Sequence, residues 1–213
     1  MIHAAEILRT LAAKRPVFHS EADFQHAFAW EIHQQLRDAY VRLEYRPALL
    51  PTRAYVDVWV QHQEQILAIE LKYKTAPLSL QLDNGEKFDL LSQAAQDIGR
   101  YDFIRDLWRL EQVATHYANA LTLAVLLTNE SKYWRTSMRS AAFDAAFHVH
   151  EGRQIEGLLK WGEGTGEGTM KNREVSLSLT RAYRCAWKPY SQVESQKNGE
   201  FKYLALASEP GLL

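Results

Sequence analysis

The chain has 213 residues, of which 46% are hydrophobic and 24% charged, and its net charge is −1. This composition is typical of a folded globular protein and excludes the disordered and fibrous classes. The length suits one domain with a sizeable core. Because the net charge is close to zero, any basic surface for a nucleic acid must be local.

Three features favour a cytoplasmic protein. Cys185 is the single cysteine, so an intrachain disulfide is excluded and a reducing compartment is favoured. The N-terminal segment carries Glu6 and lacks the continuous apolar core of a secretory signal. No apolar run approaches the length of a membrane span. We therefore expect a cytoplasmic location and no membrane partner.

The first forty residues predict two amphipathic helices. Apolar positions recur through residues 2–14, and Pro16 closes this first helix. Ser20, followed by acidic residues, resembles a capping box that begins a second helix over residues 20–39. Its apolar side chains recur every four residues, at Phe24, Phe28, Ile32 and Leu36.

Three strand candidates come next. The first covers residues 41–49 and stops near the prolines at 47 and 51. Residues 54–60 and 66–74 alternate or run apolar, and a polar turn at 62–65 joins them. The spacing predicts a hairpin.

The second half of the chain predicts a long helix and further strands. After a turn at Asn84-Gly85, the longest helical pattern runs from about Phe88 to Val113. A buried strand, a helix and a closing pair of strands follow over residues 120–129, 133–147, 174–190 and 201–208. The order α-α-β-β-β-α-β-α-β-β predicts an α/β protein, with helices packed on a mixed central sheet, in a single domain over residues 1–213.

Charged residues interrupt the two most strand-like segments. Asp57 lies between valines, and Glu70 and Lys72 flank Leu71 at the end of an apolar run. Because strand side chains alternate, Glu70 and Lys72 share one face, and in a hairpin Asp57 projects toward the same side. Two carboxylates held close together repel each other, and a hard divalent cation removes the conflict.

The spacing alone also allows a plainer interpretation. An acid-x-Lys triplet is common by chance, and an Asp on an antiparallel strand can simply face water. On this interpretation Glu70 and Lys72 form a surface ion pair.

The motif and the element order together resemble the PD-(D/E)XK nuclease superfamily. Val56-Asp57 lies on one strand and Glu70-Leu71-Lys72 ends the next, after an acid-bearing helix, with a valine in the place of the motif's proline. The superfamily's α-β-β-β-α-β order matches the elements predicted over about 20–130. The resemblance implies a restriction-endonuclease-like αβββαβ core, to which helix 2–14 and the C-terminal strands are additions.

The resemblance also implies roles for these residues. Asp57 and Glu70 would bind Mg²⁺ or Mn²⁺, with the backbone carbonyl of Leu71 as a further ligand, and Lys72 would position or help deprotonate the attacking water. An acid on the first helix of the core often completes such a site. Glu21 is the candidate and Glu31 the reserve, while stabilisation of the helix dipole explains Glu21 equally well.

Further residues are assigned more loosely. Many members of the superfamily carry a supporting Gln on the long helix, and Gln93 or Gln96 matches that feature. The alternative is a solvated stripe of local ion pairs. The cations expected to contact phosphate are Lys74, Arg100, Arg46 and Arg53. The glycine-rich segment 162–168 lacks the Lys-Ser/Thr ending of a phosphate loop, and we expect a mobile loop there.

The function that the resemblance implies is metal-dependent hydrolysis of phosphodiester bonds in DNA. A near-neutral chain fits a nuclease that works within a homodimer or larger assembly, or on a defined structure, better than a tight nonspecific binder. The alternative is a non-catalytic module on the same fold that binds nucleic acid or protein.

Overall fold

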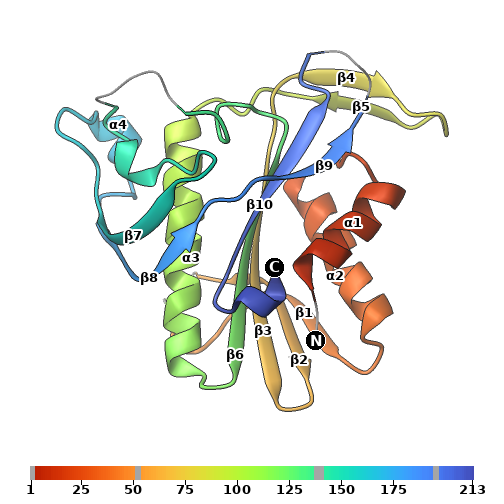
Figure 1. Ribbon diagram of the computed structural model, residues 1–213, viewed down its shortest axis with the longest axis horizontal. Coiled ribbons are helices and arrows are strands. Elements are labelled where there is room, and N and C mark those ends of the chain that lie inside the picture. The colour runs from red at the N-terminus through yellow and green to blue at the C-terminus, as the bar shows by residue number, and fades with distance from the viewer. Residues whose placement is uncertain (1–2, 51–53, 137–141, 194–196) are drawn as a thin grey trace.

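The computed structural model describes residues 3–50, 54–136, 142–193 and 197–213 (Figure 1). It is an α/β structure in which helices flank a mixed central sheet of six strands, which confirms the predicted class. The strand order is β1-β2-β3-β6-β10-β9. The bounds are β1 Tyr40–Tyr45, β2 Val56–His62, β3 Gln65–Lys74, β6 Ala120–Thr128, β9 Lys188–Gln192 and β10 Glu200–Ala207.

The sheet is mixed because one central pair of strands is parallel. β3 and β6 run parallel from Ile66 opposite Ala120 to Lys74 opposite Thr128, whereas the other neighbouring pairs are antiparallel. A parallel pair needs a long crossover connection. The long helix α3 (Gln96–His116) is part of this connection and packs against both strands.

Helices cover the two faces of the sheet. Helices α1 (Ala4–Lys14) and α2 (Glu21–Gln35) lie on one face and α3 on the other (Figure 1). Alternate side chains of β3 therefore enter two separate apolar layers. Leu71 and Tyr73 are packed under α1 and α2, and Ile66 and Ala68 under α3.

The start of α2 is fixed by a side-chain cap. Ser20 Oγ accepts a hydrogen bond from the backbone N–H of Asp23, 3.1 Å away, as the capping pattern predicted. Arg15 Nη2 lies 2.7 Å from a carboxylate oxygen of Asp23. These contacts place the first helical residue, Glu21, beside the end of β3.

Smaller elements complete the described chain. They are a hairpin of β4 (Leu78–Gln81) and β5 (Lys87–Leu90), a paired β7 (Gln154–Leu159) and β8 (Leu177–Arg184), the short helix α4 (Glu167–Met170), and the 3-10 turns Ala145–Phe147 and Pro210–Leu212. Across the described ranges, every helix is too short or too polar to cross a bilayer.

The predicted start of the long helix was wrong. Residues 88–90 belong to β5, which pairs with β4 through the turn at Asn84-Gly85, and α3 begins only at Gln96. Gly85 has φ +88°, the left-handed backbone that this turn requires. Leu90 falls in helical register with the residues of α3, so periodicity alone extended the helix backwards.

Two predictions for the C-terminal half also need correction. The expected helix over 133–147 falls partly on residues 137–141, outside the described residues, and its described part contains a turn and one 3-10 turn. The expected closing pair divides between two sheets: β9 pairs with β10, whereas β8 pairs with the unpredicted strand β7. The expected loop over 162–168 includes the first residues of α4.

One close approach near the start of α3 gives a test of the packing. A Cβ added to Gly99 would overlap the hydroxyl of Tyr133, which is buried. We expect Gly99→Ala to lower the free energy of unfolding by about 1–3 kcal/mol, although alanine favours helix by about 1 kcal/mol. In a Tyr133→Phe background the same change should cost much less, because the hydroxyl is gone. Denaturant unfolding of the four proteins of this cycle measures both values, and an equal cost in the two backgrounds would contradict the packing.

Candidate functional site

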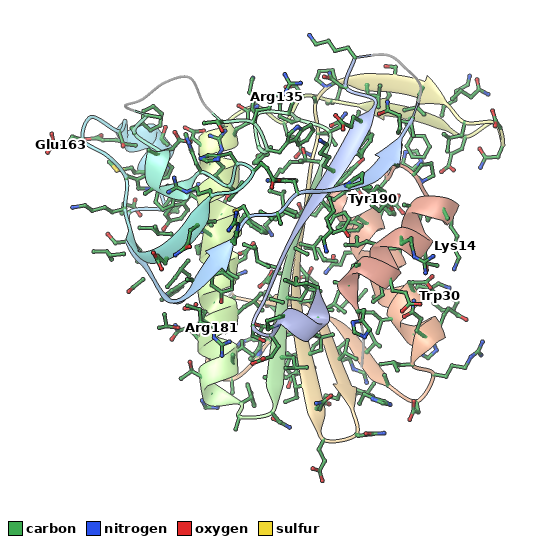
Figure 2. All side chains as sticks on the ribbon, in the orientation of Figure 1. Lys14, Trp30, Arg135, Glu163, Arg181 and Tyr190 are labelled. Carbon is green, nitrogen blue, oxygen red and sulfur yellow. The ribbon has the colours of Figure 1, made fainter. Side chains whose placement is uncertain are left out.

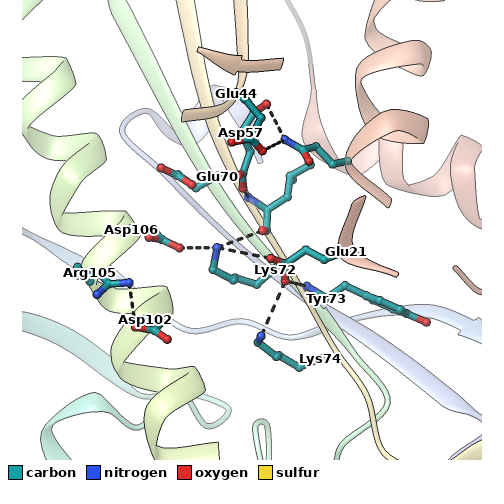
Figure 3. A network of polar contacts seen from close by, with 12 residues as sticks. Glu21, Glu44, Asp57, Glu70, Lys72, Tyr73, Lys74, Asp102, Arg105 and Asp106 are labelled. Atoms are coloured by element: carbon teal, nitrogen blue, oxygen red, sulfur yellow. Dashed lines mark hydrogen bonds and ion pairs between the residues drawn. The ribbon is translucent and has the colours of Figure 1, made fainter. Parts of the chain in front are cut away.

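Two carboxylates hold the end of β3 where β2 leaves it. The paired register of β2 and β3 ends at Val58 opposite Ile69. Beyond that point, Asp57 Oδ2 accepts the backbone N–H of Leu71 at 2.6 Å, and Glu21 Oε2 accepts that of Tyr73 at 2.9 Å (Figure 3). Carboxylates from β2 and α2 thus accept the backbone hydrogen bonds that β2 no longer provides to β3.

The charged side chains on the other face of β3 meet α3. Arg109 Nη2 lies 2.8 Å from Glu70 Oε1 and 2.7 Å from Asp106 Oδ1. Lys72 Nζ lies 2.7 Å from the second oxygen of Asp106, in an ion pair that lacks hydrogen-bond geometry. Figure 3 shows Lys72 between Asp106 on one side and Glu21 on the other. The prediction that Glu70 and Lys72 share one face is confirmed.

The surface ion pair considered for Glu70 and Lys72 is wrong. The side chain of Glu70 is only 2% exposed, and its ionic partner is Arg109. The side chain of Lys72 is 15% exposed, and its ionic partners are Asp106 and, at 3.9 Å, Glu21. Its Nζ also donates to the backbone carbonyl of Leu71 at 3.4 Å. These charges therefore lie inside the protein, where a charge must be compensated.

Burial makes the two strand carboxylates difficult to ionise. Desolvation raises the pKa of Asp57 to about 6, although Lys72 and the N–H of Leu71 act in the opposite direction. The pKa of Glu70 is also raised well above its ordinary value, first by burial and then by the charges of Asp106 and Asp57. Each carboxylate thus raises the cost of ionising its neighbours.

The pKa values of Lys72 and Arg109 are also raised, which for a cation favours the charged form. Burial alone would lower the pKa of Lys72, but the surrounding carboxylates, Asp106 first, raise it above the ordinary lysine value. For Arg109, burial likewise lowers the pKa, but the charges of Asp106 and Glu70 raise it above the ordinary arginine value. Lys72 is therefore held as an ammonium group.

The geometry distinguishes between the two candidate acids of α2. Glu21 lies at the end of β3, with its carboxylate 3.9 Å from both Lys72 Nζ and Lys74 Nζ. Glu31 lies ten residues further along the same helix, 2.8 Å from Lys14 of α1. Only Glu21 is brought to the strand charges.

Gln25 is a residue of the site that sequence reasoning missed. Its Nε2 donates to the backbone carbonyl of Asp57 at 2.8 Å and to Glu44 Oε1 at 3.0 Å. It lies one helical turn after Glu21, so one face of α2 holds both β2 and β3. Gln25 is a polar residue among the buried positions of α2, and this position was the signal in the sequence.

The expected glutamines are not brought to the site. Gln93 precedes α3 and is exposed, and its backbone N–H donates a hydrogen bond to the carbonyl of Thr75. Gln96 begins α3 and donates to Glu130. It is ten residues, or about 15 Å of helix, before Asp106. The residues that α3 does contribute are Asp106 and Arg109.

The sequence carried a signal for Asp106. It lies at helical spacing with the buried residues Phe103, Leu107 and Leu110, so an acid occupies the apolar stripe of α3. An acid in such a stripe indicates a buried charge with a partner. Because the helix was predicted to begin at about Phe88, the site residues were expected near its N-terminal end, at Gln93 and Gln96.

The cations expected to contact phosphate lie in different places. Lys74 is at the site, beside Glu21. Arg100 is bound elsewhere, 2.6 Å from Asp144 and 2.8 Å from the carbonyl of Lys132. Arg46 is exposed just after β1. Arg53 lies outside the described residues.

The donor set fits a hard divalent cation in its chemistry. Asp57 and Glu70 supply carboxylate oxygens. The backbone N–H of Leu71 donates to Asp57, and its carbonyl accepts from Lys72 Nζ at 3.4 Å. Oxygen donors of this kind suit Mg²⁺ and Mn²⁺. Counting Glu21 and Asp106, four carboxylates face the three cations Lys72, Lys74 and Arg109. In the described part of the chain, however, no three His, Cys, Asp or Glu side chains are already arranged as metal ligands.

Comparison of the chain with protein-family models, curated proteins and solved structures gives no match.

The raised pKa of Asp57 predicts an effect on stability. The unfolded carboxyl titrates near pH 3.9 and the folded one near 6, so the folded state binds this proton more tightly. Protonated Asp57 therefore adds to the free energy of unfolding at low pH. This contribution, up to about 3 kcal/mol, is lost as the pH rises through about 4 to 6. We expect Asp57→Asn, in EDTA, to raise the free energy of unfolding by about 1–3 kcal/mol at pH 8 and by less at pH 4.

Denaturant unfolding at the two pH values measures this difference. Glu31→Gln is the matched control, because that carboxylate is also buried but has Lys14 as a direct partner. It should bring no gain in stability at pH 8. An Asp57→Asn protein less stable than the wild type at pH 8 would show that the carboxylate is well compensated without a metal.

Proposed function

We propose that this protein is a metal-dependent nuclease that hydrolyses phosphodiester bonds in DNA. The observation that carries the proposal is the convergence of Asp57, Glu70, Lys72 and Glu21 where β2 leaves β3 (Figure 3). These residues come from three different elements. Their types match the motif for which the resemblance to PD-(D/E)XK nucleases was noted.

The proposed ligands are the carboxylates of Asp57 and Glu70 and the carbonyl of Leu71. A bound Mg²⁺ or Mn²⁺ would supply a Lewis acid for a phosphoryl oxygen and lower the pKa of a water. The surplus of carboxylates supports this assignment, because Asp106 raises the pKa of both Asp57 and Glu70, and Asp57 raises that of Glu70 further. A cation would relieve a repulsion that Arg109 and Lys72 compensate only in part.

Lys72 acts in the proposed mechanism as a donor. Its ammonium is maintained by Asp106 and Glu21, so it is suited to orient a water or hold a phosphate oxygen and unsuited to remove a proton. Asp106 and Arg109 position it and Glu70 from α3. Lys74, one pleat further along β3, is placed to contact the next phosphate of the substrate.

One observation favours the alternative of a non-catalytic module on the same fold. Glu70, Arg109, Asp106 and Lys72 form a continuous series of ion pairs. Such a series satisfies the buried charges in part without a metal. A module of this kind would bind nucleic acid or protein and leave it intact.

Cleavage assays separate the two functions. The substrates are supercoiled plasmid, linear duplex, single strand, branched DNA and RNA, each with Mg²⁺, Mn²⁺ or EDTA. We expect metal-dependent cleavage of DNA that falls by about a hundredfold or more in Asp57→Asn and in Lys72→Gln. Glu31→Gln is the control and should keep wild-type activity.

The other outcomes are equally informative. Cleavage that survives in both site variants would mean that the activity does not come from these residues. DNA retained without cleavage in either metal would favour the non-catalytic module. Thermal unfolding of each variant distinguishes loss of the site from loss of the fold, since Lys72→Gln removes a partner of buried Asp106.

A further inference from the structure

A groove between α2 and β1 runs along the free edge of the sheet. Its volume is about 510 Å³. One wall is formed by His26, Ala29, Trp30 and His33, which are spaced as one face of a helix. The other wall is the continuous segment Ala39–Leu43, which includes the first four residues of β1.

The second wall exposes a backbone edge. Side chains of a strand alternate between its faces, so a groove on one face would touch every second residue. This groove touches five consecutive residues, which places it along the strand itself. β1 is the terminal strand of the six-stranded sheet and, within the described ranges, pairs only with β2. A free strand edge is a template for pairing with another segment.

Large apolar side chains are exposed beside that edge. Trp30 is 64% exposed and Tyr40 is 49% exposed. Figure 2 shows Trp30 at the outer side of the helical layer. Leu43 is also among the exposed large side chains. Exposed aromatic residues gathered at one groove mark an interaction surface more often than scattered single residues do.

The charges of the groove indicate what it binds. Its lining includes Arg42, His26 and His33 and no carboxylate. The acids next to the segment are turned elsewhere, since Asp38 lies 3.3 Å from His62 and Glu44 accepts from Gln25. A second copy of this chain packed groove to groove would bring Arg42 against its own counterpart. A segment that carries carboxylates is complementary.

We propose that β1 and this groove bind an extended segment of a partner protein in which apolar and acidic residues alternate. The segment adds a strand to β1 along about 17 Å, the length of five residues. Its apolar side chains cover Trp30 and Tyr40, and a carboxylate meets Arg42. The proposal is independent of the nuclease activity.

Selection from a phage-displayed library of random twelve-residue peptides tests this proposal. The full chain is the bait, and enriched sequences are synthesised with a fluorophore for anisotropy. We expect enriched peptides with alternating apolar and acidic residues. Trp30→Ala and Arg42→Glu should each weaken their binding by about tenfold or more. The matched controls, Leu158→Ala and Arg184→Glu, change exposed residues of the β7–β8 sheet and should leave binding unchanged.

Backbone pairing is tested on the peptide. N-methylation of alternate peptide nitrogens should abolish binding in one of the two registers, because those nitrogens donate to β1. Equal binding of both methylated peptides would overturn the added strand.

Other results would overturn the choice of partner. No enriched sequence, or enriched peptides that bind Trp30→Ala as well as the wild type, would remove the groove as a docking site. Dimers seen by sedimentation velocity in the wild type and lost in Trp30→Ala would assign the groove to a second copy. A single-stranded oligonucleotide whose binding needs Trp30 and Arg42 would assign it to nucleic acid.

Discussion

The site depends on one interruption of the sheet. β2 stops pairing with β3 after Val58 and Ile69, and β3 continues to Lys74. A buried N–H without a partner costs about 1–3 kcal/mol, so the continuing strand needs acceptors. Asp57 and Glu21 provide them for Leu71 and Tyr73. Two carboxylates are therefore brought together by a backbone requirement, before any catalytic role is considered.

The same interruption explains why the neighbouring charges are tolerated. Glu70 and Lys72 point to the α3 face, where Asp106 and Arg109 compensate them within 2.8 Å. The compensation is incomplete, because Asp57 and Glu70 still ionise with difficulty. Buried ion pairs of this kind contribute little to stability in themselves. The free-energy cost of burying these charges is explained if the site has a function that requires several charges close together.

The sequence predicted the elements whose physical signals are local. The capped start of α2, the hairpin of β2 and β3, and the shared face of Glu70 and Lys72 follow from capping and strand alternation. Glu21 could not be separated from Glu31 in the sequence, because both lie on one helix and only the position of β3 distinguishes them.

The contribution of α3 was harder to predict for a related reason. Leu90 falls in register with the helix, so the pattern began too early and Gln93 was placed on α3. The actual partners, Asp106 and Arg109, lie about four turns beyond Gln93. Which turn of a crossover helix meets β3 is decided by long-range packing. The partners of Gln25 are of the same kind, since β1 and β2 are far from α2 in the sequence.

We propose that the carboxylates at the end of β3 form a site for a divalent cation. Isothermal titration calorimetry of Mn²⁺ into the wild type, Glu70→Gln and Glu31→Gln tests it without reference to any substrate. We expect binding to the wild type and to Glu31→Gln, and an affinity at least about tenfold lower for Glu70→Gln, because a direct ligand is lost. Equal affinity in all three proteins, or no binding to the wild type, would contradict it.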